Sequence, residues 1–203
     1  MTWKQSHWFA LAARIDNGRV TGVAGTWFDN GNGNPGRGGV ITVDPTGQSA
    51  PMFQAVANVL LTRMRHAEVI VAYDAPRVLG ALEAEFTTAG LLSEWIGIVG
   101  SGQRLVVDPL VLVNLKRVGR FWKRRWADES RHDLLNAADR LDVMAPGDAD
   151  RPDCRAILTG RVLWHLAEHM PDDAADAAAW LAEKREEQER EHREWREREG
   201  GGS

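Results

Sequence analysis

The sequence contains a single cysteine, Cys154, among its 203 residues. One cysteine cannot form an internal disulfide or a multi-cysteine zinc site, and such scarcity is typical of the reducing cytoplasm. The sequence also lacks any apolar run near the ~20 residues that span a bilayer, and its first residues, MTWKQSHW, lack the apolar core of a signal peptide. We therefore expect a cytoplasmic protein without a membrane partner.

The net charge of −4 is small, but the charge is unevenly distributed. From Asp172 onward, eleven acidic residues stand against six Lys or Arg, which gives this tail a net charge of −5. Residues 116–131 carry the opposite sign, because seven Lys or Arg stand against Asp128 and Glu129. Local charge predicts partners better than the total does, so this basic stretch is suited to contact phosphate.

The first half of the chain predicts antiparallel strands. Residues 7–15 and 19–28 are rich in β-branched and aromatic residues, and Asp16-Asn17-Gly18 between them is a strong signal for a tight hairpin turn. A loop rich in Gly, Asn and Pro follows, and the sequence GVITV after it predicts a third strand.

The rest of the body alternates strands and helices. EVIVAYDA and RLVVDPLVL are expected to form buried strands. Apolar residues at helical spacing predict helices over 51–66, 77–88, about 110–126, 131–141 and 153–169. Antiparallel strands followed by strand–helix alternation indicate an α/β fold, a mixed sheet flanked by helices, over residues 1–170.

Residues 171–203 form a separate charged tail that we expect to be helical. EKREEQEREHREWREREG contains favourable i,i+4 pairs such as Glu186–Arg190 but no apolar stripe. Two interpretations remain open: a solvated helix, or a helix that binds a protein partner through Leu181 and Trp195, which lie two heptads apart. On either one, truncation after Met170 should leave a folded body. The final GGGS resembles an expression linker.

Several segments, in this order, resemble the DEDD-type 3′–5′ exonucleases with a histidine base, the family of the proofreading subunit of bacterial replicative polymerases. AARIDNGRVTG resembles the second and third strands of that family, and VIVAYDAPRVLGALEAEF resembles its second motif. RLVVDPLVLVNLKR, RHDLLNAADRLDV and DCRAILTGRVLWHL resemble the segments that follow, so the likeness covers roughly residues 8–168. The resemblance implies an RNase H-like fold in which four carboxylates hold two Mg²⁺ or Mn²⁺ ions and a histidine activates water.

The carboxylates that this resemblance requires are mostly missing. The sequence contains no Asp-x-Glu, so either the family's first strand is absent or the strand HWFALAARI replaces it without its acids. The aspartate of the second motif falls on Val78 and the histidine on Asp148, whereas Asp153 matches the aspartate of the third motif. The resemblance therefore predicts the fold without the usual nuclease chemistry, with no catalytic residue or metal ligand assigned.

Acidic residues elsewhere leave a displaced metal site open. Asp74 and Asp108 end two adjacent strands, and Asp148, Asp150 and Asp153 lie close together before the last core helix. These five residues are the remaining candidates for a Mg²⁺ or Mn²⁺ site. The alternative is that they cap helices and turns, because acids are favoured at helix N-termini.

The basic stretch is the clearest interaction signal. Its cations can supply sequence-independent affinity for phosphates, and Trp122 or Trp126 could stack on a base, or both could belong to the core. The expected nucleic-acid-binding residues are Lys116, Arg117, Arg120, Lys123 and Arg124.

Three hypotheses follow from the sequence. The first is a catalytically degenerate exonuclease-like protein that binds single-stranded nucleic acid or a protein partner, for example in replication or phage assembly. The second is an active metal-dependent nuclease with displaced acids. The third is a structural or assembly protein that uses the fold as a scaffold and the tail as a docking helix.

Overall fold

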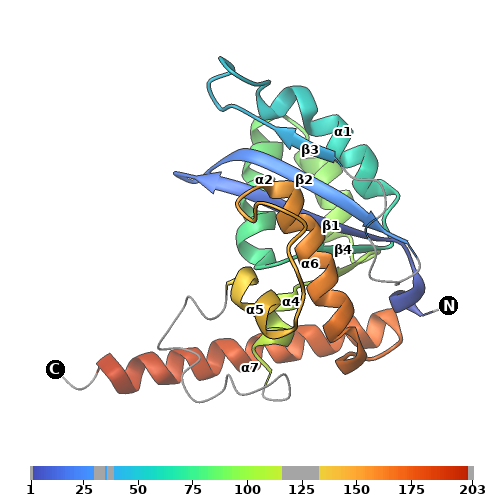
Figure 1. Ribbon diagram of the computed structural model, residues 1–203, viewed down its shortest axis with the longest axis vertical. Coiled ribbons are helices and arrows are strands. Elements are labelled where there is room, and N and C mark those ends of the chain that lie inside the picture. The colour runs from blue at the N-terminus through green and yellow to red at the C-terminus, as the bar shows by residue number, and fades with distance from the viewer. Residues whose placement is uncertain (1, 30–34, 36–38, 116–132, 201–203) are drawn as a thin grey trace.

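The computed structural model of the protein describes residues 2–29, 35, 39–115 and 133–200. Five strands form one sheet in the order β3-β2-β1-β4-β5 (Figure 1). Their bounds are Trp8–Asp16 for β1, Arg19–Phe28 for β2, Gly39–Thr42 for β3, Val69–Ala72 for β4 and Leu105–Val107 for β5.

The expected hairpin is confirmed. β1 and β2 pair antiparallel from Trp8–Phe28 to Asp16–Arg19, with an irregularity between Arg14 and Ile15. The turn needs two residues with positive φ, and Asn17 and Gly18 supply them at 51° and 75°. Asn and Gly tolerate this left-handed region, which explains why the Asp-Asn-Gly sequence marks the turn.

The sheet is mixed, as expected. β3 and β2 pair antiparallel, whereas β4 is parallel to both β1 and β5. This strand order and these directions form an RNase H-like arrangement, so the expected fold class is confirmed. The strand of residues 8–16 is the central strand of the sheet.

Side-chain alternation along the strands divides the core into two layers. Trp8 and Ala10 of β1 pack on one face of the sheet, and Phe9 and Leu11 pack on the other. β4 repeats this alternation with Val69 and Val71 against Ile70 and Ala72. Because successive side chains point to opposite faces, strands buried on both faces are apolar throughout.

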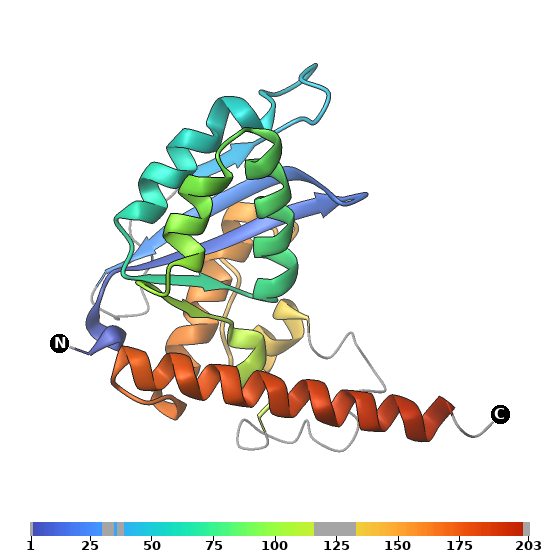
Figure 2. The same ribbon diagram turned by 180° about the vertical axis from the view of Figure 1, so that it is seen from behind.

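Helices cover both faces (Figures 1 and 2). The face with Phe9 carries α1, Phe53–Arg65, α2, Ala75–Thr88, α3, Leu92–Trp95, and the short π-helix η2, Ile96–Gly100. The face with Trp8 carries the short helix η1, Trp3–Gln5, then α4, Pro109–Val113, α5, Leu134–Arg140, and α6, Pro152–Leu166, which continues as η6, Ala167–His169.

The expected helices are observed within a few residues of their predicted bounds, with two differences, and the short helices α3 and η2 were not expected. Helix α2 begins at Ala75 and not at 77, because Pro76 fits its first turn. The expected strand RLVVDPLVL ends at Val107, and its second half forms helix α4, because Asp108 caps a helix that begins at Pro109. Helix α4 ends at Val113, and residues 116–126 of its expected continuation lie outside the described residues.

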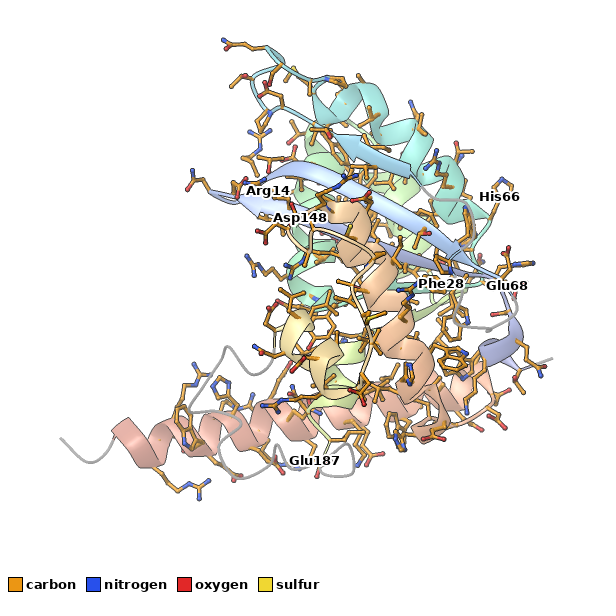
Figure 3. The ribbon with its side chains drawn as sticks, in the orientation of Figure 1. Arg14, Phe28, His66, Glu68, Asp148 and Glu187 are labelled. Atoms are coloured by element: carbon orange, nitrogen blue, oxygen red, sulfur yellow. The ribbon has the colours of Figure 1, made fainter. Side chains whose placement is uncertain are left out.

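Helix α6 packs unusually close to the hairpin. A Cβ added to Gly160 would lie 2.1 Å from Cε2 of Phe28, the last residue of β2, so the phenyl ring occupies the space that a side chain at position 160 would take. Phe28 is fully buried, and Figure 3 shows it beside α6. Glycine at this position therefore permits the approach of helix and sheet.

The charged tail forms α7, Ala174–Gly200, which runs along β5 and α4 and extends past the body at its C-terminal end (Figure 2). The expectation that this tail has no apolar face to bury is wrong for its first half. Ala177 and Leu181 are at most 4% exposed and belong to the core layer on the Trp8 face, and Trp180 packs against it. Few apolar residues suffice here because the body already offers a complementary apolar surface.

The N-terminus reinforces this docking. The indole of Trp3 donates a 2.7 Å hydrogen bond to the carbonyl of Pro171, and Lys4 bonds the Met170 carbonyl and the Asp172 carboxylate. Among the described residues, no helix has both the length and the apolarity that a membrane span requires.

Candidate functional site

A cavity lies where β1 and β4 end and the helices of the Trp8 face begin. Its volume is about 1100 Å³. In open α/β sheets, ligands bind in the crevice outside the carboxyl ends of the strands, which makes this cavity the candidate site. We call it the strand-edge pocket. Its ionisable and polar lining residues are Arg14, Tyr73, Asp74, Arg77, Asn114, Asp133, Asp150, Arg155, Thr159, Glu189 and His192.

Asp108 follows β5 directly but does not line this pocket. Its carboxylate is 3% exposed and accepts hydrogen bonds from the backbone N–H groups of Asp74, Ala75 and Leu110, at 2.9–3.0 Å. Burial raises the pKa of Asp108 to about 6, while the N–H donors oppose that rise. The residue therefore caps α4 and fixes the turn between β4 and α2, which is the capping role that the sequence left open.

Asp74 does lie at the strand edge, on the pocket wall. Its backbone adopts the left-handed conformation with φ 56°, held by the two N–H bonds to Asp108. Burial raises the pKa of its carboxyl above the ordinary value, and Arg77 opposes the rise. Asp74 and Asp108 thus end adjacent strands as expected, but only Asp74 faces the pocket.

The three acids before α6 have different surroundings. Asp150 lines the pocket, whereas Asp148 is exposed and accepts the backbone N–H of Asp150 at 3.0 Å. Asp153 is bound through both oxygens by the guanidinium of Arg151, at 3.1 and 2.8 Å, and this pairing lowers the pKa of Asp153. The one acid that matches the resemblance is therefore engaged by an arginine two residues away.

The β1 wall of the pocket carries no acid. It consists of residues 11–15, whose only charged member is Arg14. Val78 of α2, at the position of the missing second-motif aspartate, also lines the pocket. The position that the resemblance assigns to the second-motif aspartate thus presents an alkyl group to this space, and the only charged residue of the β1 wall is a cation.

Arginines on three elements were not predicted as site residues. Arg14 comes from β1, Arg77 from α2 and Arg155 from α6. Arg155 lies 3.3 Å from Asp133, which also caps α5 through its bond to the Leu134 N–H. Tyr73 packs against the core layer of the Trp8 face, and burial raises the pKa of its phenol, with Asp108, Asp133 and Asp74 adding to the rise. No sequence motif joins these residues, since only the topology brings them together.

Helix α7 also contributes to the pocket, through Glu189 and His192. These residues lie three apart on one face of the helix, and the ring of His192 stacks on Trp195 at 6.0 Å. The sequence offered no signal for this, because the tail reads as uniformly charged.

The structure describes the candidate metal ligands but not the basic stretch. Within the described ranges, no three His, Cys, Asp or Glu side chains are grouped closely enough to hold a metal ion. The expected nucleic-acid-binding residues lie outside the described ranges, in the segment between Leu115 and Asp133. Those residues are Lys116, Arg117, Arg120, Lys123 and Arg124.

Two comparisons of the sequence with known proteins give no relative. A scan of protein-family models finds no match to this chain, and a search of curated proteins finds none either. The resemblance to the exonucleases with a histidine base accordingly remains a hypothesis.

Proposed function

We propose that this protein binds single-stranded nucleic acid at its strand-edge pocket and does not cleave it, as a catalytically degenerate relative of the DEDD-type exonucleases. The observation that carries the proposal is the wall of the pocket formed by β1 and α2. That wall presents Arg14 and Arg77, while the position that the resemblance assigns to the second-motif aspartate holds an alkyl side chain.

The surrounding acids support binding without hydrolysis. Asp108 accepts hydrogen bonds from three backbone N–H groups, and Asp153 accepts from Arg151. Asp133 accepts from Arg155 and from the first backbone N–H of α5. A carboxylate that already serves as an acceptor must give up those bonds before it can hold a hard cation. Two-metal hydrolysis would need several such carboxylates to be free at the same time.

The basic stretch supports a polyanionic partner. Two described residues that flank this stretch in the sequence, Asn114 and Asp133, line the pocket. Arginines on the wall of a crevice suit a flexible phosphate backbone, whose binding releases counterions. We place this activity in the cytoplasm, in replication or phage assembly.

Binding and digestion of a labelled oligothymidylate test the proposal together. We expect salt-sensitive binding, weakened when Arg14 and Arg77 are both changed to Gln, with a salt slope smaller by about 0.7 per lost contact. The matched control changes Arg63 and Arg65 of α1, which do not line the pocket. We expect no degradation with Mg²⁺ or Mn²⁺. Absence of binding even at low salt would reject the proposal and leave the protein-scaffold hypothesis, with α7 as a docking helix.

A metal-dependent nuclease is the second candidate function. Four carboxylates from four elements line the same pocket: Asp74, Asp133, Asp150 and Glu189. Digestion of the oligonucleotide that needs Mg²⁺ or Mn²⁺ and disappears in Asp74→Asn would establish this function in place of the first. Asp148→Asn is the control, because Asp148 does not line the pocket.

A further inference from the structure

The charge balance of the strand-edge pocket depends on the C-terminal helix. Among its Arg, Asp and Glu residues, the body contributes three arginines and three aspartates. Helix α7 adds one more carboxylate, Glu189, and thereby gives this set a net negative charge. A phosphate that enters the pocket toward Arg14 and Arg77 therefore meets a carboxylate that belongs to the tail.

Glu189 is held at the pocket by buried contacts of its neighbours. The side-chain amide of Gln188 donates a 2.8 Å hydrogen bond to the carbonyl of Val111, and Gln188 is only 8% exposed. One turn earlier, Arg185 lies 3.7 Å from the buried carboxylate of Asp108. Leu181 anchors the preceding turn in the core. These contacts fix the rotation of the helix, so that Glu189 and His192 are the residues that reach the cavity.

We infer that α7 is an autoinhibitory element, in which Glu189 opposes the binding of phosphate-bearing ligands at the strand-edge pocket. This inference rests on the proposed function, because it concerns the same pocket. Charge repulsion weakens with distance and with screening by salt, so the glutamate that lines the pocket repels a bound phosphate more strongly than the glutamates farther along the tail do. Removing that charge should strengthen binding.

The chain supplies a closely matched control for this test. Glu189 and Glu194 are both exposed residues of α7, and each stands four positions before an arginine, Arg193 or Arg198. Replacing either glutamate by Gln changes the net charge of the protein equally and leaves the arginine four positions later in place. Only Glu189 lines the pocket.

The experiment measures the affinity of a fluorescein-labelled oligothymidylate for full-length wild-type protein and for three full-length variants. We expect Glu189→Gln to bind about fivefold tighter at low salt, and Glu189→Lys to bind tighter still. Glu194→Gln should bind within about twofold of wild type, because its charge lies away from the pocket. High salt should abolish the gain.

Two outcomes would overturn the inference. Equal affinities of wild type, Glu189→Gln and Glu194→Gln would leave the proposed function intact and remove the inhibitory role of α7, as would equal gains in both Gln variants. If no form of the protein bound the probe, Glu189→Lys included, the proposed function would fail and the inhibitory role would fail with it.

Discussion

The guanidinium of Arg185 on α7 lies 3.7 Å from the carboxylate of Asp108, which is almost completely buried. One carboxylate therefore connects three parts of the molecule: it caps α4, it fixes the turn at Asp74, and it faces the C-terminal helix. This geometry makes the docking of α7 and the shape of the pocket wall depend on the same buried group.

The stability of the protein should depend on pH through Asp108. Because burial raises its pKa from 3.8 to about 6, the folded state binds this proton more tightly than the unfolded state does. The resulting stabilisation is complete below the ordinary pKa and is lost as the pH rises through about 6.

Denaturant unfolding of wild type and Asp108→Asn checks this dependence. Between about pH 5 and pH 7, wild type should lose about 1 kcal/mol relative to the variant. The variant also loses one carboxylate oxygen that accepts hydrogen bonds from backbone N–H groups. It is therefore expected to be less stable at both pH values, so the change in the stability gap between the two pH values is the relevant quantity. A stability gap that stays constant with pH would contradict the raised pKa.

Leu181→Ala should destabilise the whole protein. Leu181 is 4% exposed and packs into the main core layer, so its truncation should cost about 2–3 kcal/mol. Thermal unfolding should then shift by roughly 2–4 °C per kcal/mol for a chain of this size. Glu183→Ala, an exposed change on the same helix, should shift it by at most about 0.5 kcal/mol. Equal melting temperatures for the two variants would mean that α7 is not docked in solution and that the body folds without it.

Two Gly→Ala changes in helices should have opposite effects. In α2, a Cβ on Gly80 meets no heavy atom within 4 Å, so Gly80→Ala should stabilise the helix by about 0.5–1 kcal/mol. In α6, the Cβ on Gly160 would overlap the buried ring of Phe28, so Gly160→Ala should destabilise the protein by about 1–3 kcal/mol despite the same gain in helix propensity. Denaturation midpoints measure both. A stabilised Gly160→Ala would refute the close packing of α6 on β2.

The elements themselves could be predicted from the sequence because their signals are local. Alternation in HWFALAARI and VIVA indicates strands, and Asp16-Asn17-Gly18 fits only a tight turn with positive φ. The order of antiparallel and parallel segments then restricts the sheet to few topologies, of which the RNase H-like one is observed.

The pocket and the tail were decided by tertiary structure. Asp74, Asp108 and Asp153 look alike in the sequence, but one lines the pocket, one is consumed by backbone N–H groups and one is bound by Arg151. The free energy of ionising a carboxyl group depends on its burial and on hydrogen-bond donors from distant segments of the chain. No local sequence pattern encodes that burial or those donors. For the same reason, the sequence of the tail predicts only a charged helix, whereas in the structure that helix has a buried face. Ala177, Leu181 and Gln188 stabilise the docked helix because β5 and α4 supply the surface on which they pack.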